Sequence, residues 1–308
     1  MDKSNFDPGL TQQYTATLRR AINKDGRFNI RRRGVTWHDF HPYLYLITVS
    51  WRAFLALLLA GFVTLNCFFA ILYYATGIEH LHGAEAPTAW GRFLNGFFFS
   101  THTLTTVGYG SIYPEGVLAN SIAAVEALAG LMIFAIATGL LVGRVSRPSA
   151  RIGFSDRMIV APYRGITSLQ FRIVNRRMGN LMELDARVLL MTVEEVEGRL
   201  QRKFLELKLE RDHVLFFPLT WTIVHPIEPD SPLFGVTPED LEKRQAEALI
   251  MIKGIDDTFN QAVHVRYSYR YDEIEWGAKF EPAFNIDGEG NMWIEVNRVS
   301  ALAASPLQ

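Results

Sequence analysis

Two long apolar runs restrict what this chain can fold into more than any other feature of its sequence. The first, residues 53–75, contains no charged side chain, and the second, residues 117–143, contains one carboxylate, Glu126. About 20 consecutive apolar residues suffice to cross a hydrocarbon core of about 30 Å. Two buried helices of a soluble protein are the alternative, but soluble cores rarely contain uncharged stretches of this length. We therefore expect two membrane-spanning helices.

Basic residues predict how these helices are oriented. The connecting residues 76–116 contain Arg92 as their one Lys or Arg, whereas bases are frequent on the other two flanks. Because cytoplasmic flanks carry an excess of Lys and Arg, we expect a multi-pass protein of the inner (plasma) membrane, with both termini in the cytoplasm. The flanking bases are Lys3, Arg19, Arg20, Lys24, Arg27, Arg31, Arg32, Arg33 and Arg52 before the first run, and Arg144, Arg147, Arg151 and Arg157 after the second.

The segment before the first run mixes aromatic, apolar and polar residues. At helical spacing, Phe40, Tyr43, Leu44 and Ile47 share one face, and Pro42 suits the first turn of a helix. This pattern predicts an interfacial helix along the inner membrane surface. A short linker is the alternative.

The connector between the runs is itself apolar. Residues 93–105 predict a helix that is too short to span a membrane, and the pentapeptide Thr-Val-Gly-Tyr-Gly follows it at 106–110. Irregular backbone at membrane depth is tolerated where it is buried in protein or lines a water-filled cavity. We therefore expect a half-spanning helix followed by a backbone segment that lines a pore.

The chemistry of this pentapeptide, here called the filter segment, suits potassium. Rings of inward-pointing carbonyls can replace the hydration shell of the ion. Gly108 and Gly110 allow backbone dihedrals that a side chain would forbid, and Thr106 can add a ring of hydroxyls. Val107 and Tyr109 are expected to point outward and pack the segment against helices. The short helix directs its negative end at the central cavity, which favours a cation there.

One such strand cannot surround an ion, so the function requires a closed symmetric oligomer, here a homotetramer. The expected potassium ligands are Thr106, Val107, Gly108 and Tyr109. Potassium is then the permeant ion, and no cofactor is expected. The near-balanced charge, 31 Lys and Arg against 32 Asp and Glu, gives no indication of a nucleic-acid partner.

Four stretches together resemble the inward-rectifier potassium channels, particularly their bacterial branch. They are residues 95–110 around the filter segment, Arg144-Val-Ser-Arg-Pro148, residues 221–235 beginning Trp-Thr-Ile-Val-His-Pro, and residues 269–282 beginning Tyr-Arg-Tyr-Asp-Glu. The resemblance implies two transmembrane helices and a pore helix, with a C-terminal all-β, immunoglobulin-like cytoplasmic sandwich. It implies four parts: an N-terminal cytoplasmic segment (1–35), an interfacial helix (36–49), a transmembrane pore domain (50–148) and the sandwich (149–308).

The second apolar run carries the gate candidates. Phe134, Thr138 and Val142 share one helical face, which the resemblance places toward the pore. Gly130 matches the family's bending glycine, although a glycine for helix packing explains it equally well. Strongly rectifying members carry an acidic residue where this chain has Phe134, so strong block by polyamines is not expected.

The chain also departs from the family in how the filter is supported. Eukaryotic members pair a glutamate on the short helix with an arginine after the filter, but His102 and Ile112 stand at those positions here. His102 and Glu126 are therefore the candidates for filter support. An ionisable residue within a membrane span is a functional candidate, while a protonated packing residue is the alternative for Glu126.

The C-terminal half shows alternating segments separated by Gly and Pro turns, at 171–175, 185–192, 203–209 and 248–252. This pattern predicts an all-β sandwich, and no constellation of an enzyme is found in it. By family position, Glu273 is a candidate for an acidic ring in the cytoplasmic pore, with an exposed edge charge as the alternative.

Basic residues cluster where this half is expected to meet the membrane. Anionic lipids are candidate partners for such a cluster, with about 1 kcal/mol per base near the surface, although the positive-inside rule explains the same bases without a lipid site. The candidates for lipid head-group binding are Arg31, Arg32, Arg33, Arg144, Arg147 and Arg151.

Two other functions compete with this interpretation. A two-span channel gated by a nucleotide-binding domain would need a parallel α/β pattern after residue 148, and that pattern is absent. A membrane-anchored sensor without conduction would need neither ion flux nor fourfold assembly.

Overall fold

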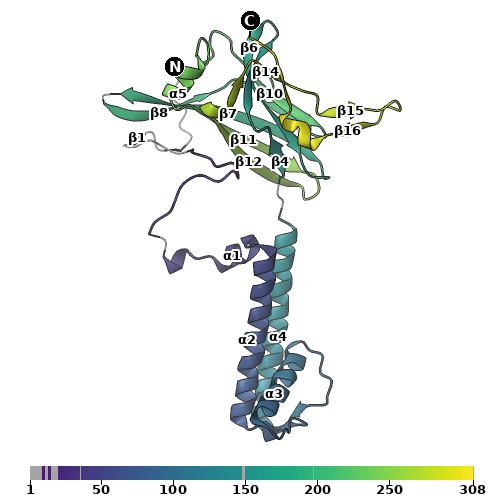
Figure 1. The fold of residues 1–308 in the computed structure, drawn as a ribbon. Helices are drawn as coiled ribbons and strands as arrows, with labels where there is room; N and C mark the ends of the chain where they lie inside the picture. Colours follow the sequence, from purple (N-terminus) through teal and green to yellow (C-terminus); the bar gives the residue numbers. More distant parts are fainter. Residues whose placement is uncertain are drawn as a thin grey trace. The chain divides into compact units, whose positions relative to one another are not determined.

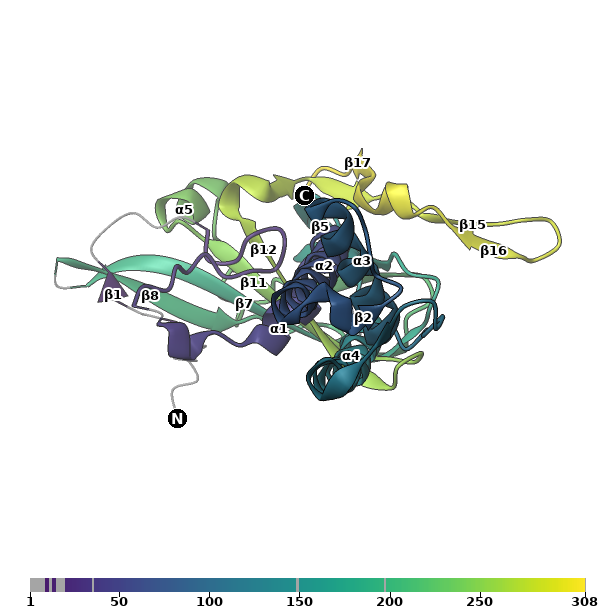
Figure 2. The same ribbon diagram turned by 90° about the horizontal axis from the view of Figure 1, so that it is seen from below.

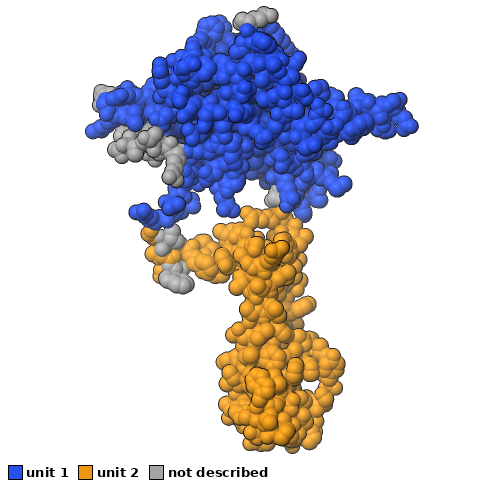
Figure 3. Space-filling view, in the orientation of Figure 1, with its two compact units in different colours: residues 1–33, 148–308 blue, residues 34–147 orange. Residues whose placement is uncertain are grey.

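The computed structural model describes residues 9–10, 13–14, 20–34, 36–147, 150–196 and 198–307. They form two compact units (Figure 3): unit 1 comprises residues 1–33 and 148–308, and unit 2 comprises residues 34–147. Most of the expected N-terminal segment before residue 20 lies outside the described residues, as do Lys3, Arg19 and Pro148.

Unit 2 is built around two long helices, α2 and α4, with the shorter α3 packed against both (Figure 1). Both long helices are long and apolar enough to cross a membrane, and together with the β-rich second half of the chain they confirm the predicted fold class. Its elements are η1 (Trp37–Asp39), α1 (Pro42–Thr48), α2 (Trp51–Thr76), η2 (Ile78–His80), β2 (Leu81–His82), α3 (Ala89–Leu104), β3 (Tyr113–Pro114) and α4 (Gly116–Val145).

Capping residues and glycines define the helix ends. The Ser50 side chain accepts a hydrogen bond from Ala53 N at the start of α2, and the Thr88 side chain accepts one from Gly91 N at the start of α3. Helix α2 ends at Gly77, whose φ of 102° is unfavourable for other residues. The membrane spans are thus slightly longer than the apolar runs predicted.

Helix α1 occupies the predicted interfacial segment, and none of its residues is buried. Pro42 is its first residue, as expected for a residue that has no backbone N–H to donate. Phe40 lies before the helix begins, because the chain is extended at His41. The predicted apolar face is therefore reduced to Tyr43, Leu44 and Ile47.

Glycines allow α3 to approach both long helices. A Cβ at Gly96 would lie 3.6 Å from Ala70 O on α2. On α4, a Cβ at Gly130 would overlap the backbone carbonyl of Leu104, the last residue of α3. The end of α3 is therefore held at backbone contact with α4, and α4 continues through Gly130 without a break.

Unit 1 is a sandwich of two sheets. Among the described residues, one sheet has the strand order β1-β8-β7-β11-β12, with β9 also paired to β7, and the other has the order β10-β6-β5-β13, with β4 paired to β6. The strands are β1 (Gln13–Tyr14), β4 (Ile152–Phe154), β5 (Met158–Tyr163), β6 (Ile166–Asn175), β7 (Leu181–Val196), β8 (Arg199–Glu206), β9 (His213–Phe216), β10 (Thr220–Pro226), β11 (Glu247–Asp256), β12 (Gln261–Arg270) and β13 (Ile274–Trp276).

Alternation along the strands produces the core. In β7, Ala186, Val188 and Leu190 are buried, and they face Ile252, Ile250 and Ala248 of β11 in antiparallel register. The alternate residues Asp185 and Arg187 are exposed, and Leu189 is half-buried. The period of two thus gives one buried face, as the sequence predicts.

Smaller elements complete unit 1. Helix α5 begins with a capping box between Thr237 and Asp240. The β15–β16 hairpin extends away from both sheets in Figures 1 and 2. These elements are α5 (Pro238–Lys243), η3 (Tyr271–Glu273), β14 (Ala278–Phe280), β15 (Phe284–Ile286), β16 (Met292–Ile294), η4 (Val296–Ser300) and β17 (Leu302–Ala304).

Candidate functional site

The filter segment begins directly at the end of α3. The amide of Thr106 donates to Thr103 O at 3.1 Å, and the amides of Val107 and Gly108 both donate to His102 O, at 2.9 and 3.3 Å. The backbone of the last turn of α3 therefore holds the start of the filter segment, so a displacement of this turn displaces the segment.

The sign of φ alternates along the backbone of the filter segment. Thr106, Gly108 and Gly110 have φ values of 60°, 53° and 79°, whereas Val107 and Tyr109 have negative φ. Regular strands and helices of L-residues keep φ negative throughout. A change in the sign of φ at each residue lets successive carbonyls point to the same side. A row of cation ligands requires this arrangement.

One side of the filter segment is uncovered within a single chain. All five residues are exposed, and a Cβ at Gly108 or Gly110 would meet no atom of the chain within 4 Å. Tyr109 is 74% exposed, and its ring makes an edge contact with His102, 4.8 Å between centroids. His102 thus packs against a filter side chain, at the position where we predicted filter support.

Behind the filter segment, four buried polar side chains connect α2, α3 and α4. Ser100 of α3 is hydrogen-bonded to Asn66 Oδ1 of α2 at 3.0 Å and to Glu126 Oε1 of α4. The Tyr73 hydroxyl of α2 donates to Glu126 Oε2 at 2.7 Å. None of the four side chains is accessible to solvent. Glu126 therefore contacts the pore-helix candidate α3, and does so through Ser100.

The predicted gate residues lie on an open face of α4. Phe134 is 72% exposed and Val142 is 59% exposed in the single chain, and Thr138 between them is exposed and donates to Phe134 O at 2.8 Å. Gly130 instead faces the end of α3, where its role is close packing.

Arg144, a predicted lipid ligand, is engaged within unit 2. Its guanidinium donates to Leu46 O and, at 2.6 Å, to Val49 O at the end of α1. It also lies over the rings of Trp51 and Phe54, at 4.7 and 4.5 Å. These contacts connect the end of α4 with the end of α1. The other predicted lipid ligands are exposed: Arg31, Arg32, Arg33, Arg147 and Arg151.

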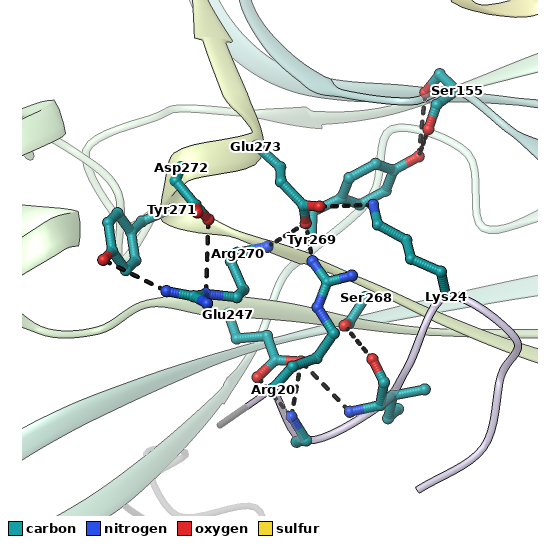
Figure 4. Close-up of polar contacts among 12 residues, drawn as sticks. Arg20, Lys24, Ser155, Glu247, Ser268, Tyr269, Arg270, Tyr271, Asp272 and Glu273 are labelled. Carbon is teal, nitrogen blue, oxygen red and sulfur yellow. Dashed lines mark hydrogen bonds and ion pairs between the residues drawn. The ribbon is translucent and has the colours of Figure 1, made fainter. Parts of the chain in front are cut away.

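Glu273, the candidate for an acidic ring in the cytoplasmic pore, binds the chain around Arg20 and Lys24 within unit 1 (Figure 4). Its carboxylate pairs with Arg20 and, at 2.9 Å, with Lys24. Burial alone would raise the pKa of Glu273, but the hydrogen bonds from Lys24 and Arg270 N and the charges of Lys24 and Arg20 outweigh it and lower the pKa. Two cations of the same chain thereby compensate its negative charge.

Residues 20–28, here called the N-terminal segment 20–28, have a second anchor at Glu247 (Figure 4). This carboxylate accepts hydrogen bonds from the amides of Ala21 and Ile22, the shortest at 2.9 Å, and Ser268 Oγ donates to Ile22 O at 2.7 Å. Ile22 also packs with Met191, Phe204 and Leu249 of the sandwich.

His225 lies in the sandwich and is almost fully buried. Its Nδ1 lies 2.6 Å from Lys208 O, and its Nε2 lies 2.8 Å from Ser231 Oγ. Burial lowers the pKa of His225, although the Lys208 carbonyl and the charges of Asp230 and Glu228 oppose this shift. The geometry is that of a neutral, structural imidazole that donates from Nδ1.

Sequence reasoning missed the two partners of Glu126, Ser100 and Tyr73, the Asn66 side chain beyond Ser100, and the contacts that anchor the N-terminal segment 20–28. Asn66 is a polar amide within an otherwise apolar run, which could have marked it as a helix contact. Ser100 and Tyr73 give no comparable signal, because both residue types are common in apolar helices.

Comparison with known proteins places these features in a family context. A model described as the inward rectifier potassium channel C-terminal domain matches residues 152–306, and a model described as ion channel matches residues 53–147. The chain is 36% identical over 288 residues to the inward rectifier potassium channel Kirbac3.1 of Paramagnetospirillum magnetotacticum, covering 92% of this chain and 96% of that protein.

Animal channels are more distant relatives. The chain is 28% identical over 307 residues to the ATP-sensitive inward rectifier potassium channel 12 of Gallus gallus, covering 91% of this chain and 70% of that protein. It is 28% identical over 273 residues to the inward rectifier potassium channel 4 of Homo sapiens, covering 77% of this chain and 61% of that protein.

Proposed function

Because the chain belongs to the inward rectifier potassium channels, we propose that four copies of it assemble around one axis, with the filter segment of each copy facing that axis. The chain is a potassium-selective membrane channel and not an enzyme. What remains to be proposed is how its own residues form the conduction path, how it is oriented and what regulates it.

The alternation of φ over residues 106–110 is the observation that carries the proposal. With four copies around the axis, carbonyls of Thr106, Val107, Gly108 and Tyr109 would form successive rings that replace the hydration shell of potassium. The exposure of this segment in the single chain supports assembly, because lone irregular backbone is not stable in lipid. No further cofactor takes part in this scheme.

We propose that the exposed face of α4 lines the pore on the inner side of the filter segment. Phe134, Thr138 and Val142 would line it, and four Phe134 rings are wide and apolar enough to exclude water from a narrow passage. The gate is therefore assigned to Phe134, with Val142 as a second constriction nearer the end of α4.

We propose that both termini lie in the cytoplasm of the cell that carries the channel in its inner (plasma) membrane, as the distribution of Lys and Arg indicates. The exposed bases would attract anionic lipid head groups, by about 1 kcal/mol each. These are Arg31, Arg32, Arg33, Arg147 and Arg151. Arg144 is assigned a different role, since its guanidinium is already bound by carbonyls of α1.

Uptake of rubidium or thallium into liposomes that contain the pure protein tests this function. We expect uptake that barium blocks and that an outward gradient of potassium, but not of sodium, can drive. Cross-linking and light scattering of the same sample should give four chains per particle. Failure of uptake by an intact tetramer would favour the alternative of a membrane-anchored sensor.

A further inference from the structure

The polar contacts between α4 and α3 decide between the two alternatives for Glu126, an ionised and a protonated carboxyl. Three oxygen–oxygen contacts run in series through Asn66, Ser100, Glu126 and Tyr73: Asn66 Oδ1 to Ser100 Oγ, Ser100 Oγ to Glu126 Oε1, and Glu126 Oε2 to Tyr73 Oη. Each contact is a hydrogen bond and needs one proton. The hydroxyls of Ser100 and Tyr73 supply one proton each.

The orientation of the Asn66 amide decides where the third proton must lie. Asn66 Nδ2 donates to Phe62 O at 2.7 Å, and a flipped amide would place two acceptors against each other there. Asn66 Oδ1 therefore faces Ser100 and has no hydrogen of its own. The Ser100 proton must lie between these two oxygens.

Ser100 Oγ can then only accept from Glu126. An ionised Glu126 would leave two oxygens in contact without a proton between them, in a position that water does not reach. In the part of the chain that the structure describes, Glu126 forms no ion pair, so nothing there compensates a buried negative charge. We propose that Glu126 is a neutral carboxylic acid that donates its proton to Ser100 and positions α3, and with it the filter.

The route from Glu126 to the filter is short. Ser100 and Leu104 are one turn apart on α3, and Glu126 and Gly130 are one turn apart on α4, so the two helices meet at two successive levels. Ser100 is hydrogen-bonded to Glu126, and Leu104 lies against Gly130. Between these levels lies His102, whose carbonyl accepts from the amides of the filter segment.

This inference rests on the proposed function, and Glu126→Gln tests it in the full-length channel in liposomes. A glutamine amide donates from nitrogen and accepts at oxygen, as a protonated carboxyl does. We therefore expect rubidium uptake and potassium-over-sodium selectivity to stay within about twofold of wild type. Glu126→Leu leaves the Tyr73 hydroxyl without a partner and Ser100 with Asn66 as its one remaining partner, and it should reduce selectivity roughly tenfold. Ser100→Ala should weaken selectivity in the same direction.

Infrared spectroscopy supplies a readout that needs no ion flux. The difference spectrum of wild type and Glu126→Gln at neutral pH should contain the carbonyl band of a protonated carboxyl. A carboxylate band in its place would overturn the proposal, as would a Glu126→Gln channel that is as impaired as Glu126→Leu. If the wild type conducts no ions, the proposed function fails, whereas the infrared band still decides the state of Glu126.

Discussion

Lys24 Nζ lies 2.9 Å from Glu273 Oε1 and at the same time over the rings of Tyr267 and Tyr269, at 4.6 and 4.9 Å from their centroids. A cation held by a carboxylate and two aromatic faces is well fixed. This contact joins the N-terminal segment 20–28 to strand β12 and the turn that follows it, and it has measurable consequences.

Glu273→Gln should loosen the N-terminal segment 20–28. The change removes charge-assisted hydrogen bonds worth about 1–2 kcal/mol, which corresponds to a roughly 5- to 30-fold faster amide exchange in this segment. Hydrogen–deuterium exchange of the full chain measures it. Glu275→Gln is the matched control, because its pair with Arg157 is exposed and contributes little. Equal exchange in both variants would contradict this role of Glu273.

Gly108→Ala should abolish selective potassium uptake. Gly108 has a φ of 53°, and an alanine in this left-handed conformation costs about 1–2 kcal/mol in each of the four copies. The ordered carbonyl rings are then lost, and rubidium and sodium uptake into liposomes should converge. Gly61→Ala is the control, because a Cβ within α2 at this position meets no atom of the chain. Undiminished selectivity in Gly108→Ala would refute the filter assignment.

Phe134→Asp should raise basal uptake and create sensitivity to spermine applied from the cytoplasmic side. Aspartates would replace four apolar rings by hydrated carboxylates, which removes the barrier to water and provides a site for a polycation. Size-exclusion chromatography must first show an intact tetramer. An intact variant with wild-type uptake and no spermine block would exclude Phe134 as the gate.

Acidification should destabilise the sandwich through His225. Because burial lowers its pKa in the folded state, the unfolded chain binds the proton more readily, and stability decreases as the pH falls below the ordinary histidine value of about 6.5. The decrease in melting temperature from about pH 7.5 to about pH 5.5 should be smaller in His225→Gln than in wild type. His213→Gln, which alters an exposed imidazole, should retain the full decrease.

The sequence predicts the spans and the filter segment well because their constraints are local. A long uncharged run forms a helix in lipid, and glycine is the residue that readily takes the positive φ found at Gly108 and Gly110. The hydrogen bonds by which His102 O holds Val107 and Gly108 are not visible in the sequence.

Contacts between distant elements do not follow from the sequence. Glu273 pairs with Arg20 and Lys24, and nothing in the periodicity of residues 20–28 indicates where they dock. Ser100 and Tyr73 meet Glu126, and Asn66 meets Ser100, through the rotation of three helices about their axes. That rotation depends on packing at glycines such as Gly96 and Gly130, which a single sequence does not reveal.

The composition of unit 1 from two separate stretches of chain has a consequence for how unit 2 is attached. The chain leaves unit 1 after Arg33, runs through α1, α2, α3 and α4, and returns at residue 148. Because Glu247 and Glu273 anchor the N-terminal segment 20–28, both ends of unit 2 lead into unit 1. Release of the segment from these two carboxylates would leave the second stretch of the chain as the connection between the sandwich and unit 2.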